Sequence, residues 1–172
     1  MASTRMMKKE RRYGRLVQLN GTVSSGLGRA HVFMSQPHYQ DQFRTILGTT
    51  AWPGTLNVKV EEMNLVNYIA LRKKAGIDTL DAEEAAREGA THIDVSTIES
   101  IRVRGFLRDG VSFGGATAYQ ATIAHEGNSI PCAILIPDLT RHVDVVEVIS
   151  GPFLRERLEI EDGAEVSLTL AN

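Results

Sequence analysis

Thr55 and Asn57 carry neutral side-chain oxygens two positions apart in the segment 54–60, which follows a Trp-Pro-Gly turn. Side chains alternate between the two faces of a strand, so this segment predicts a β-strand with both residues on one face. The same alternation places Lys59 with them and puts Leu56, Val58 and Val60 on the other face. Paired oxygens suit Mg²⁺, a hard ion that keeps several waters and is often bound together with substrate phosphates. An ordinary half-exposed strand with outward polar residues explains the same pattern.

The segment 24–28, Ser-Ser-Gly-Leu-Gly, is the second stretch with chemical potential. Glycines let a ligand approach the backbone closely, and consecutive N–H groups can form a nest for phosphate oxygens. A plain connection between two strands, the second at 29–34, is the alternative. The segment is not a Walker A loop, because no Gly-Lys-Ser/Thr follows, and we expect no helix directly after Gly28, which argues against a Rossmann fingerprint.

Composition narrows the class of protein. The 172 residues are 42% hydrophobic and 23% charged, with a formal net charge of −2. This balance predicts a soluble globular protein that binds neither nucleic acid nor a membrane surface. No apolar run is long enough to span a bilayer, and the N-terminus lacks a signal-peptide core, so we expect a cytoplasmic protein. Cys132, the single cysteine, lies in the apolar run 130–136 and is expected to be a buried, inert thiol.

The element pattern is mainly β. Residues 1–13 predict a flexible basic tail, and residues 14–172 one domain. A helix is expected at 37–47 with Gly48 as its stop, and one helical turn near 154–158. Two helices are expected within 64–91, the second introduced by a capping box of Asp81 and Glu84, and we interpret this polar segment as an insertion on the rim. Short strands separated by turn signals predict a compact β-barrel, and they are expected at 16–23, 101–106, 118–124, 131–136, 143–149 and 165–170.

The order of several short motifs resembles the archaeal CTP-dependent riboflavin kinase family. The first part comprises Gly-Thr-Val-Ser-Ser-Gly-Leu-Gly at 21–28, Phe-Met-Ser at 33–35 and Gly-Thr-Leu-Asn at 54–57. The second comprises Ile-Leu-Ile-Pro at 134–137, Thr-Arg-His at 140–142, Val-Glu-Val-Ile at 146–149, Leu-Arg-Glu at 154–156 and Leu-Glu-Ile-Glu-Asp-Gly at 158–163. Each motif is short, but together they cover most of the chain. The resemblance implies a six-stranded cradle-loop barrel.

The resemblance also implies roles for individual residues. Thr55 and Asn57 would bind Mg²⁺, and Thr140 and Glu147 would contact riboflavin or FMN, with Glu147 the candidate general base. Nucleotide contacts would come from two segments: Gly26, Leu27, Gly28, Arg29, Ala30 and His31, and Pro152, Phe153, Leu154 and Arg155. Family members often have Gly-Leu-Gly-Glu-Gly in the first segment, where this chain has Arg29 and Ala30 in the last two places. The segment before Glu147 is about one residue shorter than the family pattern.

The implied reaction is Mg²⁺-dependent transfer of the γ-phosphoryl group of CTP to the 5′-hydroxyl of riboflavin, giving FMN and CDP. We expect riboflavin and CTP as partners and a monomeric enzyme. Two alternatives stay open. One is a non-catalytic barrel that binds a flavin or a nucleotide. The other is a DNA-binding regulator, which the basic segment 1–13 favours and the acidic net balance opposes.

Overall fold

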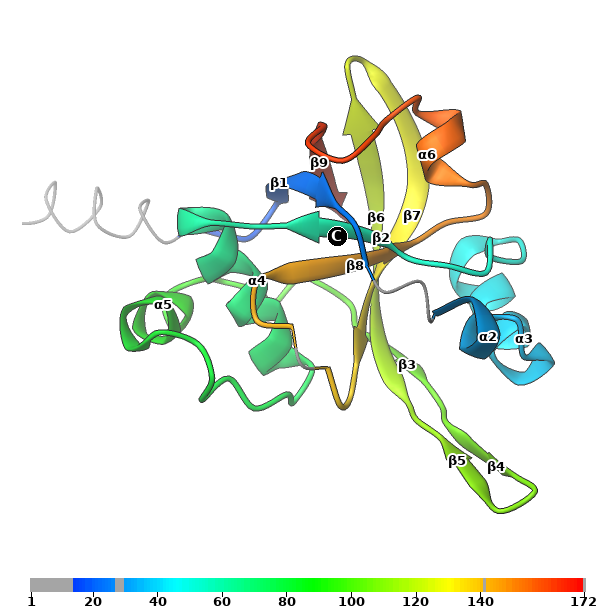
Figure 1. Cartoon of the computed structure of the whole chain (residues 1–172). Helices are drawn as coiled ribbons and strands as arrows, with labels where there is room; N and C mark the ends of the chain where they lie inside the picture. Colours follow the sequence, from blue (N-terminus) through cyan, green and yellow to red (C-terminus); the bar gives the residue numbers. More distant parts are fainter. Residues whose placement is uncertain (1–13, 27–29, 141, 172) are drawn as a thin grey trace, which may run out of the picture.

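The computed structural model describes residues 14–26, 30–140 and 142–171, and its main feature is a closed β-barrel. Seven strands form an antiparallel sheet in the order β3-β6-β7-β8-β2-β1-β9. Because β6 also pairs with β9, six strands close into a barrel and β3 lies outside it (Figure 1). The predicted six-stranded barrel is therefore confirmed. The strand bounds are β1 Gln18–Ser24, β2 Leu56–Lys59, β3 Ile101–Val103, β6 Ala116–His125, β7 Asn128–Pro137, β8 Val145–Ile149 and β9 Glu165–Leu170.

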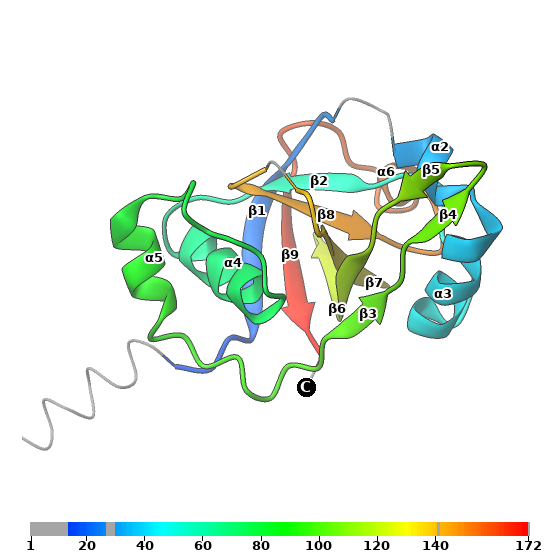
Figure 2. The same ribbon diagram turned by 90° about the horizontal axis from the view of Figure 1, so that it is seen from below.

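Two tight turns set hairpin registers. The turn between β6 and β7 has positive φ at Glu126 (48°) and Gly127 (85°), a backbone form suited to the twist of a two-residue hairpin. Asp109 and Gly110 make the same kind of turn between β4 (Phe106–Arg108) and β5 (Val111–Phe113). The single strand expected at 101–106 is thus split into β3 and β4. In Figures 1 and 2 the β4–β5 hairpin projects from the barrel on the side of α2 and α3.

Helices α2 (Ala30–Met34) and α3 (Pro37–Leu47) lie together beside the barrel (Figure 2). α3 confirms the predicted helix, which buries Tyr39, Phe43 and Ile46 and ends at Gly48. The strand expected at 29–34 is wrong, and so is the expectation that no helix follows Gly28 closely. A short apolar run does not by itself distinguish strand from helix, and here no neighbouring strand pairs with it among the described residues. Met34 is buried and the carbonyl of His31 accepts the Ser35 hydroxyl at 2.7 Å.

Helices α4 (Glu62–Lys74) and α5 (Glu84–Ala90) cover the other side of the barrel, away from α2 and α3 (Figures 1 and 2). The interpretation of this segment as a polar rim is wrong for α4. Its residues 68–72 are all buried, and four of them join the main hydrophobic core. The Tyr119 hydroxyl on β6 donates to the Leu71 carbonyl at 3.0 Å. A helix that packs against the barrel in this way is part of the core.

The predicted capping box is also wrong, because α5 begins at Glu84 with Glu83 as its N-cap residue. Asp81 instead lies 3.6 Å from the buried guanidinium of Arg72 on α4. The nearby carbonyl of Asp78 accepts a hydrogen bond from Arg72 at 3.3 Å. Asp81 therefore helps to attach the loop between the helices to Arg72 of α4, and it does not cap α5.

The main core fills the barrel and the space between the barrel and α4. Its centre contains apolar side chains that are essentially inaccessible to solvent, among them Val58, Ile123, Ile134, Val146 and Leu168. Cys132 is buried as predicted, and burial raises the pKa of its thiol to about 12, which makes it a poor nucleophile at neutral pH. The α6 turn, Leu154–Arg157, confirms the helical turn expected there.

Within the described part of the chain, no helix is both long enough and apolar enough to cross a bilayer.

Candidate nucleotide and metal site

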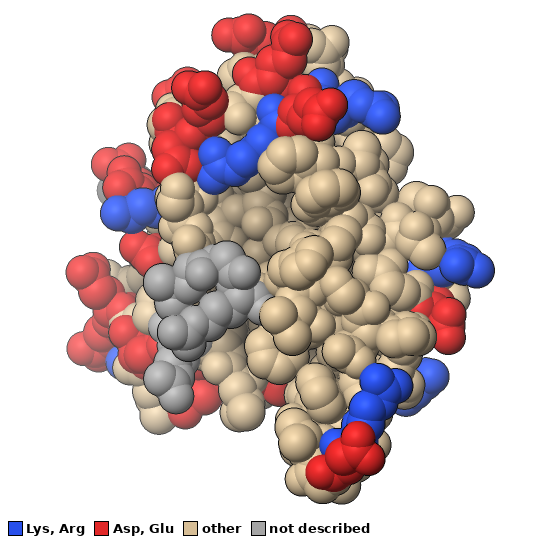
Figure 3. All heavy atoms as spheres, turned by 45° about the vertical axis from the view of Figure 1, so that its right-hand side comes forward, with Lys and Arg blue, Asp and Glu red and all other residues tan. Residues whose placement is uncertain are grey.

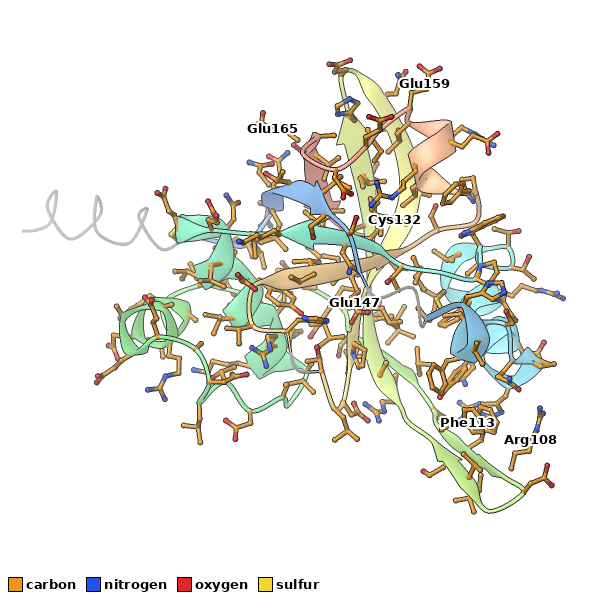
Figure 4. All side chains as sticks on the ribbon, in the orientation of Figure 1. Arg108, Phe113, Cys132, Glu147, Glu159 and Glu165 are labelled. Carbon is orange, nitrogen blue, oxygen red and sulfur yellow. The ribbon has the colours of Figure 1, made fainter. Side chains whose placement is uncertain are left out.

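Asn57 and Glu147 face each other across the β2–β8 ladder near the centre of the barrel wall (Figure 4). Leu56, Val58 and Val60 are buried and Lys59 is exposed, as the predicted alternation requires. Asn57 is buried as well, with 9% of its surface exposed, because Gly26 packs against its amide and Thr55 contacts its oxygen. Thr55 directly precedes β2, and its Oγ1 donates to Asn57 Oδ1 at 3.1 Å.

The spacing of these two oxygens fits Mg²⁺. With Mg–O bonds of about 2.1 Å, neighbouring ligands of an octahedral ion lie about 3.0 Å apart. Thr55 Oγ1 and Asn57 Oδ1 are 3.1 Å apart before any ion is placed. No cluster of three or more His, Cys, Asp or Glu side chains suited to a metal occurs in residues 14–26, 30–140 and 142–171. The neutral Thr–Asn pair is thus a fitting metal site only for an ion whose charge is balanced by an anionic ligand.

The Glu147 side chain lies beside this oxygen pair and is half-buried. Burial raises its pKa above the ordinary value of 4.5, while His142 and the Thr55 hydroxyl oppose the increase. Burial raises the pKa of the Tyr68 phenol on α4, Arg72 opposes this increase, and the nearby Glu147 adds to it. A carboxylate whose pKa is shifted toward neutrality is a better match for accepting a proton near pH 7.

Gly26 packs directly against the Asn57 amide. A Cβ placed on Gly26 would lie 2.4 Å from Asn57 Nδ2, well inside the contact distance of two heavy atoms. The absence of a side chain at position 26 therefore lets the segment after β1 fit against Asn57, whose Oδ1 contacts Thr55. The close approach of backbone predicted for the glycine segment is realised toward a protein side chain.

Gly26→Ala is expected to impair catalysis more than folding. The new methyl group would push the Asn57 amide aside, which is cheap for the fold because only the end of one side chain must move. The Oδ1 atom would leave its position beside Thr55, and we expect turnover to fall about tenfold to 100-fold. Turnover is measured against Mg²⁺ concentration, with the melting temperature as the check on folding. A variant with wild-type turnover and wild-type Mg²⁺ dependence would refute this role.

A cavity of about 110 Å³ opens next to Thr55. An aromatic pair, Trp52 and Phe153, stands at its edge with ring centroids 4.8 Å apart and both side chains partly exposed. His31 of α2 contacts the same region, with Nδ1 3.1 Å from the Pro53 carbonyl oxygen. The lining residues are Trp52, Gly54, Thr55, Leu56, Val148, Ser150, Pro152, Phe153, Leu154 and Arg155.

The side of the molecule shown in Figure 3 is a largely uncharged surface with a hollow, and acidic and basic side chains gather toward its edges. A highly charged anion bound in such a hollow could not rely on a cluster of lysines. A divalent cation and backbone N–H groups would have to balance most of its charge.

Comparison with known proteins gives a consistent result. A family model for CTP-dependent riboflavin kinases, described as "Domain of unknown function DUF120", matches residues 23–95 and 79–170. A riboflavin kinase of Methanocorpusculum labreanum is 35% identical over 153 residues, 88% of this chain and 56% of the relative. A riboflavin kinase of Sulfolobus acidocaldarius is 32% identical over 157 residues, 90% of this chain and 81% of the relative. The chain belongs to the CTP-dependent riboflavin kinase family.

Several relatives in this family are longer than the matched region. The chain covers 56% of the Methanocorpusculum protein and 56% of a Thermoplasma acidophilum riboflavin kinase that is 32% identical over 152 residues. The family match covers the barrel from the end of β1 to the last residue of β9.

The structure brings together most residues for which the family implies a role. Thr55 and the residues 152–155 border one cavity, while Asn57, which contacts Thr55, adjoins Glu147 and Gly26 outside the lining of that cavity. Leu27, Gly28 and Arg29 lie outside the described residues, as does the expected tail 1–13. Ala30 and His31 belong to α2.

The loop after β7 holds Thr140, whose Oγ1 accepts the backbone N–H of His142 at 3.3 Å. His142 is exposed but close enough to Glu147 to lower its pKa. Thr140 does not line the cavity beside Thr55. The Asp138 carboxylate forms a two-pronged ion pair with Arg102 and thus links the residue after β7 to β3, across the intervening strand β6.

Sequence reasoning missed Asp162 and Trp52 as neighbours of the site. Asp162 belongs to the motif at 158–163 but had no expected role, yet its carboxylate accepts hydrogen bonds from Ser25 and Arg155. Trp52 was interpreted only as part of the turn before β2, yet its ring stacks on Phe153. A turn signal accounts for the backbone and says nothing of distant partners, so neither contact could be found from local sequence.

Proposed function

We propose that this chain is a CTP-dependent riboflavin kinase, which transfers the γ-phosphoryl group of CTP to the 5′-hydroxyl of riboflavin and releases FMN and CDP. The observation that carries the proposal is the junction at Thr55. Thr55 borders the cavity walled by residues 152–155 and also contacts Asn57, whose cross-strand partner is the half-buried Glu147. Phosphoryl transfer requires a nucleotide site, a charge-balancing site and a proton acceptor in this arrangement.

The cavity beside Thr55 is proposed to hold the nucleotide. Phe153 and Trp52 offer exposed ring surface for the base at its edge, and Arg155 offers a cation on the cavity wall. The phosphates would then extend from this wall toward Thr55. Asn57 and Thr55 would hold Mg²⁺, which supplies charge balance for the phosphate oxygens. CTP as the donor rests on the family model alone.

Glu147 is proposed to bind the ribityl end of riboflavin and to receive the proton of its 5′-hydroxyl. The 5′-oxygen forms a bond to the γ-phosphorus as the bond to the β,γ-bridging oxygen breaks, and CDP leaves. Because the protein mainly supplies alignment, the rigid strands β2 and β8 are suitable supports for the two groups. Thr140 and His142 lie on the loop that leads into β8 and are proposed to border the flavin.

The proposal is tested by incubating the purified protein with riboflavin, MgCl₂ and each of CTP, UTP, ATP and GTP. We expect FMN to form fastest with CTP and to disappear when EDTA removes the divalent ion. Chromatographic separation of FMN from riboflavin measures the product. Absence of FMN with all four nucleotides would refute the kinase. Calorimetric binding of riboflavin or CDP in that case would instead indicate a non-catalytic binding barrel.

A further inference from the structure

Asp162 lies in the turn between α6 and β9, and this turn is fastened to the end of β1. The Gly163 N–H donates to the Val23 carbonyl at 2.9 Å, and the Val23 N–H donates to the Ala164 carbonyl at 2.8 Å. The chain before the turn is also attached to α6, because the Ile160 N–H donates to the Arg155 carbonyl at 3.0 Å. Asp162 is therefore held where three segments meet.

The Asp162 carboxylate uses both oxygens to join two of those segments. Oδ1 accepts a hydrogen bond from Arg155 Nη2 at 2.7 Å, and Oδ2 accepts one from the Ser25 hydroxyl. Arg155 Nη2 also donates to the Ser24 carbonyl at 3.4 Å. Both partners hold the pKa of Asp162 below its ordinary value, Ser25 having the larger effect. Charge-assisted hydrogen bonds of this kind are stronger than neutral ones.

Both partners of Asp162 adjoin the proposed site. Arg155 lines the cavity, and the bonds recorded for it among the described residues use only Nη2. Three further N–H donors, on Nη1 and Nε, remain for phosphate oxygens. Ser25 precedes Gly26, which packs against the metal-site residue Asn57. Asp162 thus connects the cavity wall to the segment that leads to the proposed metal ligand.

We propose that Asp162 is a positioning residue of the nucleotide site, which fixes Arg155 and the start of the glycine segment relative to each other. This inference rests on the proposed function. Asp162 acts through its two partners, so its loss should weaken nucleotide binding while leaving the flavin side, at Glu147, unchanged. A change in the KM for CTP without a change in the KM for riboflavin therefore separates this role from simple support of the turn.

The test compares steady-state kinetics of Asp162→Asn, Ser25→Ala and the double variant. Asp162→Asn keeps the shape of the side chain but removes its charge, and we expect the KM for CTP to rise about tenfold. The KM for riboflavin should stay within about twofold and kcat within about threefold. Ser25→Ala should raise the KM for CTP about threefold. The double variant should resemble Asp162→Asn alone, because residues that share one interaction give non-additive effects.

Glu161→Gln is the matched control, because it removes the same charge from the adjacent exposed position. It should behave as wild type. An Asp162→Asn protein with wild-type KM for CTP, or with equal increases of KM for both substrates, overturns the positioning role while the kinase stands. A wild-type protein that forms no FMN overturns both. If Asp162→Asn does not fold, Ser25→Ala decides: an unchanged KM for CTP overturns the role.

Discussion

Asn57→Ala is expected to reduce FMN formation about 100-fold at fixed Mg²⁺ concentration, a typical cost when a metal site loses part of its support. The variant removes one of the two oxygens that are 3.1 Å apart and leaves Thr55 as the only protein oxygen of the pair. Raising the Mg²⁺ concentration should recover part of the lost turnover, because weaker binding is offset by mass action. Turnover is measured across a series of Mg²⁺ concentrations at saturating riboflavin and CTP.

Asn20→Ala is the matched control for this variant. Asn20 is exposed on the neighbouring strand β1 and pairs with Ser167 on the adjacent strand β9, so the same chemical change occurs outside the site. The control should keep wild-type turnover and Mg²⁺ dependence. If Asn57→Ala folds, as shown by its melting temperature, yet matches the control in both respects, Asn57 is not a metal ligand.

Glu147→Gln is expected to lower turnover by about 10²- to 10⁴-fold, the range typical of losing a general base. The amide is nearly the same size but cannot take the proton of the riboflavin 5′-hydroxyl. In the wild type, kcat/KM should rise with pH as Glu147 ionises, and the raised pKa moves this rise above pH 4.5. The variant should lack this rise of kcat/KM with pH. Turnover and the pH dependence of kcat/KM are the two measurements.

Glu147→Gln should raise the stability of the fold at high pH, although it lowers turnover. Burial favours the neutral carboxyl, so folding is helped by protonation of Glu147 below about pH 4.5 and hindered as the pH rises through the folded-state pKa. Glutamine avoids the cost of a buried charge. The melting temperature of Glu147→Gln should therefore exceed that of the wild type near pH 8, and the difference should disappear near pH 4.

Glu165→Gln on β9 is the control for these measurements, because this residue is exposed and lies away from Glu147 (Figure 4). It should keep wild-type turnover, and its melting temperature should show no comparable gain at high pH. A Glu147→Gln protein that keeps wild-type turnover and the rise of kcat/KM with pH would show that another group accepts the proton.

Local patterns in the sequence determined much of this protein. The alternation at 54–60 correctly placed Leu56, Val58 and Val60 on one buried face, and the strands expected at 118–124 and 131–136 with a turn signal between them correspond to the β6–β7 hairpin. Pro37 and Gly48 marked the bounds of α3. These features depend on backbone preferences and side-chain periodicity within a few residues, and such information is present in the sequence itself.

Tertiary contacts decided the rest. The segment at 30–34 is a helix beside α3 and pairs with no strand in the described part of the chain, and α4 is part of the core because it packs against the barrel. Asn57 is buried because Gly26, distant in sequence, packs against its amide, and Asp162 meets Ser25 across a separation of 137 residues. Contacts between residues so far apart depend on how the whole barrel closes, and no local pattern encodes that closure.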